Sequence, residues 1–165
     1  MNKVFLGLSA LFLMVSTLTH QSCSCRNTKS STNSSEDSTI VVAEPDSAIC
    51  GVANDEFGMS TFAITTEEGA VIQVERTRED GTDGIIWGDV KPGDHYTMTT
   101  SDNGTTLGTA INLTQVGMFT DNFHTFNDRL ILHPDQNPDT VSIVTLDADS
   151  LVAKGREWYR MGKKK

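Results

Sequence analysis

The chain has three cysteines, and the chemistry open to each depends on its position in the sequence. Cys23 follows directly on Ser22 and comes shortly after an apolar run, Val4 to Leu18. A cysteine thiolate is a sulfur nucleophile, and a small residue before it leaves room for a peptidase to cut the chain at that point. This arrangement is typical of a site where the cysteine sulfur receives a diacylglyceryl group and the preceding segment is removed.

The segment before Cys23 has the parts of an export signal. Lys3 supplies a positive charge, and the apolar run that follows has the length of a signal core, shorter than the roughly 20 residues that span a bilayer. We therefore expect residues 1–22 to be a signal peptide and Cys23 to carry the lipid. His20 stands where a strong processing site has leucine. Cys25, which also follows a serine, is thus the alternative lipid site, and ordinary cleavage to a soluble protein is a third outcome.

The two other cysteines have less defined chemistry. Export permits a disulfide, but Cys25 falls in the expected spacer and Cys50 falls at the entrance of the folded part. We expect a buried, free Cys50, with a bond between Cys25 and Cys50 as the alternative. The chain has no paired Cys-x-x-Cys and hence no zinc signature.

The remaining polar residues give no catalytic or metal-binding pattern. His95, His124 and His133 do not have the HExxH or HxH spacing of a metal site. The acidic segments 80–84 and 147–149 resemble calcium loops, but they lack the ladder of ligands ending in a bidentate Glu, and Asx turns explain them. Neither a Gly-x-Ser-x-Gly motif nor a phosphate loop is present. We therefore expect no enzyme activity, no metal and no cofactor.

The charge of the chain limits its partners. The sequence has 13 Lys and Arg residues against 22 Asp and Glu residues. Nucleic acid is not an expected partner, because binding depends on basic side chains that neutralise phosphates. The exception is the segment 155–165, which holds five basic residues. We interpret it as a solvated, frayed tail, with contact to anionic lipid headgroups as the alternative.

The elements that must carry these residues are predicted to be a spacer and an all-β domain. After the lipidated cysteine, residues 23–46 are rich in Ser, Thr and Asn and are expected to form a disordered, flexible linker. Residues 47–114 should form five strands, as a three-stranded meander, an irregular loop and a closing hairpin. That order suits a small OB-like or SH3-like barrel. Residues 115–162 should form a four-stranded antiparallel β-meander packed on the barrel.

Aromatic residues supply the candidate binding surface. Trp87 and Tyr96 are expected on the barrel face, because Trp87 directly precedes a Gly-Asp turn and large aromatics with a polar edge suit interfaces. A core position is the alternative for Trp87. Phe119, Phe123 and Phe126 have a spacing that predicts one short helix within 118–127. That helix would plug the barrel, or Phe123 would belong to an aromatic patch that contacts a ligand.

Several short motifs carry a resemblance to a known group. A Thr-rich hairpin and a Gly-Asp turn occur between Gly51 and Leu113, followed by Ala110–Thr114, and the end of the chain has Asp139–Ile143 and Asp149–Val152. Together they resemble small Bacteroidetes lipoproteins of unknown function that join an OB-like segment to a lipocalin-like β-meander. The resemblance implies a fold and an envelope location and brings no catalytic residues. The chain departs from it at Gly117–Phe119, where such proteins often have a tryptophan.

The resemblance to these lipoproteins also leads to expectations about location and function. Some of its members carry acidic residues after the lipid cysteine as a surface-sorting signal, whereas Arg26 and Lys29 stand there in this chain. We therefore expect an outer-membrane anchor facing the periplasm, with the cell surface as the alternative. The expected function is a non-catalytic envelope module that binds a protein, a peptide or a glycan. The alternative is a lipocalin-like small-ligand carrier, which needs about eight strands around an apolar interior.

Overall fold

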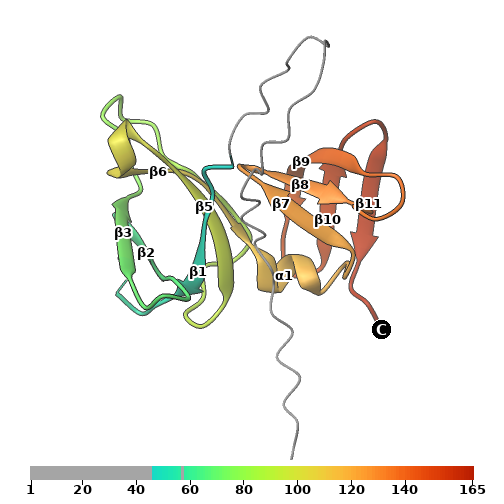
Figure 1. The fold of residues 1–165 in the computed structure, drawn as a ribbon, viewed down its shortest axis with the longest axis horizontal. Coiled ribbons are helices and arrows are strands. Elements are labelled where there is room, and N and C mark those ends of the chain that lie inside the picture. The colour runs from blue at the N-terminus through green and yellow to red at the C-terminus, as the bar shows by residue number, and fades with distance from the viewer. Residues whose placement is uncertain (1–45, 57) are drawn as a thin grey trace, which may run out of the picture.

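The described part of the protein consists almost entirely of β-strands. The computed structural model describes residues 46–56 and 58–165, in which eleven strands, one 3₁₀ turn and one short α-helix follow each other (Figure 1). The predicted all-β class is confirmed. The expected signal peptide, Cys23 and nearly all of the spacer lie outside the described residues.

The first sheet is built around a closed ring of five strands. Its order is β3-β2-β1-β5-β6-β4, and β3 also pairs in parallel with β6, which joins the ends of the ring. Closure of this kind leaves few free strand edges. The expected meander, closing hairpin and five strands are all present, and part of the expected irregular loop forms a sixth strand, β4. The strands are β1 (Ile49–Ala53), β2 (Thr61–Thr65), β3 (Val71–Glu75), β4 (Ile85–Trp87), β5 (His95–Ser101) and β6 (Thr106–Asn112).

The β2–β3 hairpin shows how the sequence pattern sets this sheet. Val74 is buried and Ile72 is partly buried, whereas Gln73 and Glu75 are exposed. This is the alternation expected of a strand with one face toward the core. At the turn, Gly69 has a φ of +81°, a conformation that strains any residue with a Cβ atom.

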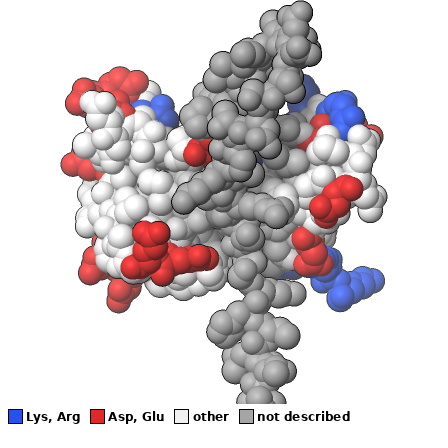
Figure 2. Space-filling model, in the orientation of Figure 1, with Lys and Arg blue, Asp and Glu red and all other residues white. Residues whose placement is uncertain are grey.

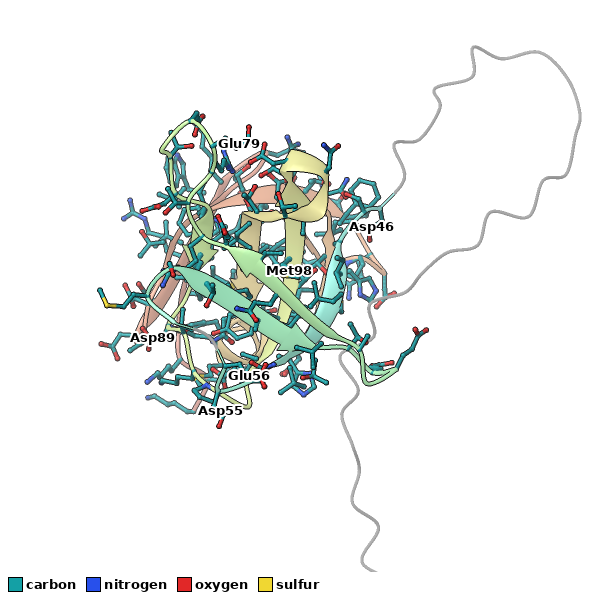
Figure 3. All side chains as sticks on the ribbon, turned by 90° about the vertical axis from the view of Figure 1, so that its left-hand side faces the viewer. Asp46, Asp55, Glu56, Glu79, Asp89 and Met98 are labelled. Atoms are coloured by element: carbon teal, nitrogen blue, oxygen red, sulfur yellow. The ribbon has the colours of Figure 1, made fainter. Side chains whose placement is uncertain are left out.

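The interior of the ring is filled by the chain's own side chains. Phe62 and Tyr96 make an edge-to-face contact with ring centroids 5.2 Å apart, and Met98 beside them has no exposed surface. In Figure 3, Met98 lies in the middle of the sheet, while acidic residues lie around the rim. The buried cluster comprises Ala53, Phe62, Ile64, Val74, Tyr96, Met98, Leu107 and Ala110.

The second sheet is a simple meander with one more strand than expected. Its strands follow the order β11-β10-β9-β8-β7, and every neighbouring pair is antiparallel. The four predicted strands are present, and β7 adds a fifth at the edge. The strands are β7 (Phe123–Phe126), β8 (Arg129–Leu132), β9 (Asp139–Leu146), β10 (Ser150–Lys154) and β11 (Trp158–Gly162).

The helix predicted within 118–127 is wrong. The structure has its helix, α1, at Leu113–Gly117, and Phe123–Phe126 form strand β7 instead. The helix begins there because the Asn112 side chain caps it, accepting a hydrogen bond from the Gln115 amide at 2.9 Å. Phe119 follows α1, whereas Phe123 and Phe126 belong to β7. The helix-like spacing of these phenylalanines therefore does not lie within one element.

One hydrophobic core connects the two sheets. It takes residues from the end of β6 and from α1, and it covers the inner face of the meander. In Figure 1, α1 lies between the two sheets, which stand side by side. The meander is therefore packed against the first sheet through apolar contacts. The buried members are Ile111, Leu113, Val116, Phe119, Leu130, Leu132, Val141, Ile143, Leu146, Leu151 and Ala153.

Candidate interaction surface

Two of the three predicted binding aromatics lie against the core between the sheets. Trp87 ends β4, where it pairs with Ile111 of β6, and its side chain is partly buried. Phe123 begins β7 and is also partly buried. Both pack against the same shared core. Both residues therefore use part of their rings in packing against this core.

The third aromatic, Tyr96, lies inside the ring of the first sheet. Its relative exposure is 0%, so the expectation that it forms an exposed binding face is wrong. The position within β5 turns its ring inward against Phe62. Its hydroxyl donates to the carbonyl of Asp89 and accepts from the Asn112 side chain at 2.9 Å. Burial raises the pKa of Tyr96 to about 12, so the hydroxyl stays protonated.

A polar network around Asn112 fixes the turn before β5. The Asn112 amide nitrogen lies 2.9 Å from the carbonyl oxygen of Asp89 and 2.7 Å from Oδ2 of Asp94. The Gln115 side-chain oxygen accepts a hydrogen bond from the Asp89 amide at 2.8 Å. Since buried polar groups need such partners, these groups have a structural role in holding the turn against α1.

Cys50 is disulfide-bonded. Its sulfur lies 3.6 Å from the hydroxyl oxygen of Thr97 on the neighbouring strand. The expectation of a free thiol is therefore wrong, whereas the alternative, a bond between Cys25 and Cys50, stays a prediction because Cys25 lies outside the described residues. The chain's other two cysteines lie outside the described residues.

The acidic loops that resemble calcium sites are Asx turns. The Asp80 carboxylate accepts hydrogen bonds from the hydroxyl and the amide of Thr82, which lower its pKa. Asp147 accepts from the amides of Asp149 and Ser150 at 2.8 and 2.7 Å, which likewise lower its pKa. Within residues 46–56 and 58–165, no group of three or more His, Cys, Asp or Glu side chains could hold a metal ion.

Asp139 is the one acidic residue within the five strands of the meander, and it points inward. Its carboxylate accepts hydrogen bonds from the Tyr159 hydroxyl at 2.9 Å and from the backbone and guanidinium of Arg156. Burial raises the pKa of this carboxyl, but these hydrogen bonds and the Arg156 charge outweigh burial and hold the pKa below its usual range. The group therefore anchors the turn between β10 and β11.

A shallow depression on the first sheet offers little to a ligand. It has a volume of about 370 Å³ with open solvent included, and it lies beside Cys50, Thr66 and His95. The binding sites of small molecules are clefts that enclose most of the ligand. The described residues around this depression do not form such an enclosure.

The outer face of the meander, which points away from the core, exposes basic and aromatic side chains. Strand register determines which residues lie on it. Lys154 pairs with Trp158 and Val152 pairs with Arg160, and these four residues alternate with inward-facing core residues. Lys154, Trp158 and Arg160 are exposed. Because Asp139 points inward, no carboxylate of the five strands faces outward. We call this surface the outer face: Lys154, Trp158, Arg160, Val152, Ser150, Thr145, Val144, Ser142, Thr140, Ile131, Arg129, His124 and Phe126.

The centre of the outer face combines an aromatic ring with positive charge. Trp158 is 55% exposed, and the Lys154 ammonium lies 5.4 Å from the centre of its ring, within the range of a cation–π contact. Val144 is 45% exposed on the same face. Trp158 falls both in the last strand expected for the meander (residues 115–162) and in the expected tail (residues 155–165), and it was not among the candidate binding residues. The signal that could have found it is the two-residue alternation through β10 and β11.

The C-terminal segment is attached to the folded part. The Lys164 amide donates to the carbonyl of Met118 at 3.0 Å, and its ammonium pairs with Asp121. The Lys163 ammonium lies 3.8 Å from the Asp149 carboxylate. The expectation of a frayed tail is wrong for these residues, because the end of β11 runs back alongside α1.

Comparisons with protein-family models, curated proteins and solved structures give no match. In the part of the chain that the structure describes, no helix is long and apolar enough to cross a membrane.

Proposed function

We propose that this chain is a non-catalytic lipoprotein of the cell envelope, anchored through Cys23, whose folded part acts by surface contact. The observation that carries the proposal is the contrast between two filled cores and the exposed aromatic and basic outer face. We further propose that the ring of the first sheet is an OB-like barrel, since it is small, five-stranded and closed by one short strand contact.

The filled cores favour surface contact over the carriage of a small ligand. Phe62, Tyr96 and Met98 occupy the ring of the first sheet, and each has no exposed surface. The inner face of the meander is covered by α1 and by the end of β6. A lipocalin-like carrier needs an enclosed apolar space for its ligand, and these side chains take that space.

The titratable groups with shifted pKa values support a non-catalytic role. Perturbed pKa values are typical of active sites, but structural networks also produce them. Asp80 and Asp147 each serve a turn, and Asp139 holds Arg156 and Tyr159 in place. These hydrogen bonds account for the shifts without a reaction.

Cell fractionation of cysteine variants tests the anchor. The wild-type protein is expected in the membrane fraction, and Cys23→Ala is expected in the soluble fraction, because loss of the acyl chains removes about 0.8 kcal/mol for each buried CH2 group. Cys25→Ala is the matched control and should stay with the membrane.

Two results would change the proposal. Release of Cys25→Ala with retention of Cys23→Ala would place the lipid on Cys25. Retention of both single variants and of the double variant would rule out a lipid anchor at this end. For the carrier alternative, mass spectrometry under native conditions should show the protein without a bound small molecule; a stoichiometric small ligand would favour the carrier.

A further inference from the structure

Charge is distributed unequally between the two sheets. Residues 47–112 hold eleven acidic and three basic side chains, whereas residues 113–165 hold seven of each. In Figure 2, most of the red atoms lie over the first sheet at the left, and the largest blue groups lie over the second sheet at the right. The protein is therefore electrostatically polarised along the line that joins its two sheets.

The charged residues within the strands of the second sheet that face outward are all basic. Lys154, Arg160 and Arg129 are the only charged strand residues of the outer face within the described chain, and all three are positive. Arg129 lies 3.8 Å from Asp128 at the β7–β8 turn, so it is partly neutralised. No ion pair of Lys154 or Arg160 is found among the described residues, which leaves these two charges open to an external partner.

We propose that the outer face docks on an anionic lipid surface, with Trp158 entering the headgroup region and Lys154 and Arg160 contacting lipid phosphates. This inference rests on the proposed anchor only for the location of the protein beside a bilayer. Tryptophan concentrates at membrane–water interfaces, and long basic side chains place their charge in the headgroups while their stems cover apolar surface. The open, pleated surface of the strands suits a broad charged plane.

The acidic first sheet does not prevent this contact. Charges separated by more than a Debye length of about 8 Å at physiological salt are largely screened. The first sheet packs on the inner side of the meander, so its carboxylates lie on the side away from the docking surface. Their repulsion from the bilayer acts instead on orientation, because it favours the pose in which the outer face meets the lipid.

Vesicle binding by the unlipidated mature chain, which begins at residue 23, tests the inference. The exported Cys23→Ser protein is mixed with phosphatidylcholine vesicles that contain about a third phosphatidylglycerol, and with vesicles of phosphatidylcholine alone. Each basic residue at an anionic surface contributes about fivefold to binding. We therefore expect binding only to the anionic vesicles, about fivefold weaker binding for Lys154→Gln, and about 25-fold weaker binding for Lys154→Gln with Arg160→Gln.

Lys91→Gln is the matched control, since Lys91 is also an exposed lysine but lies in the turn between β4 and β5, where it pairs with Asp89 at 3.5 Å. It should bind like the unsubstituted protein. Brominated acyl chains should quench the fluorescence of Trp158 and not that of Trp87, so Trp158→Phe should abolish the quenching. All these positions are exposed or conservatively changed, and circular dichroism checks that the variants fold.

Three results would overturn the inference: no binding to anionic vesicles, equal weakening by Lys91→Gln and Lys154→Gln, or binding without quenching of Trp158. Binding of an anionic glycan or peptide in the absence of vesicle binding would also overturn it, because the partner would then be a different one. None of these outcomes depends on lipid at Cys23, so a failure of docking is separate from a failure of the anchor.

Discussion

The turn between β4 and β5 offers a sharp test of how the two sheets are joined. Gly88 has a φ of +94°, and a Cβ atom added there would lie 2.6 Å from the side-chain oxygen of Gln115 and 2.9 Å from the Cβ atom of Asn112. Gly93, at the other end of the same turn, has a φ of +85°, but an added Cβ atom would meet nothing within 4 Å. An alanine would be strained at either position because φ is positive, but only at position 88 would its Cβ atom come too close to other atoms.

The expected losses of stability follow from this difference. Gly93→Ala should cost about 1–2 kcal/mol, the strain of an L residue in a left-handed conformation. Gly88→Ala should cost the same strain, about 1–3 kcal/mol for overpacking, and about 1 kcal/mol for the hydrogen bond between the Asp89 amide and Gln115. We therefore expect Gly88→Ala to cost about 3–6 kcal/mol.

Urea unfolding of both variants, in the exported Cys23→Ser background and followed by tryptophan fluorescence, measures this difference. The free energy of unfolding should be lower for Gly88→Ala than for Gly93→Ala by about 2–4 kcal/mol. Equal losses in the two variants would refute the reasoning, because the packing of the turn against α1 would then contribute nothing measurable.

The remaining predictions concern three other parts of the molecule. Trp87→Ala should cost about 3 kcal/mol, as expected for a large, mostly buried ring, and lower the melting temperature; an unchanged melting temperature would show that the ring is a contact residue. Asp139 has a lowered pKa, so its stabilisation is fully present above the unfolded-state pKa of 3.8 and is lost as pH falls from there through the lower folded-state pKa. Asp139→Asn should therefore flatten the loss of stability below about pH 4, and a profile like that of the wild type would contradict this role. Because Cys50 is disulfide-bonded and Cys23 is assigned to lipid, a non-reducing digest should contain a peptide that joins Cys25 to Cys50; a Cys23–Cys50 peptide would instead move the lipid to Cys25.

Most of the strands were predictable because their patterns are local. The alternation in β3 and the glycine at position 69 are enough to indicate a hairpin from neighbouring residues alone. The same holds for β9 and β10, two strands of the expected meander, in which buried and outward positions alternate over most of their length. In each case, inward and outward positions follow from a period of two.

The errors arose where distant contacts decide the outcome. Phe123 and Phe126 form a strand because β8 pairs with them over four residues, and this pairing is absent from the local pattern. Tyr96 has a polar edge that suits an interface, but Asn112 and the Asp89 carbonyl satisfy its hydroxyl inside the fold. The outer face was missed because its members come from strands whose register only the folded sheet defines.

The mass of the mature N-terminal peptide, from protein purified out of the membrane fraction, tests the central claim most directly. The proposed anchor predicts a chain that begins at Cys23, with a peptide mass increased by a diacylglyceryl group on the cysteine sulfur. A mature chain that begins at another residue, or one that begins at Cys23 with an unmodified sulfur, would contradict the account.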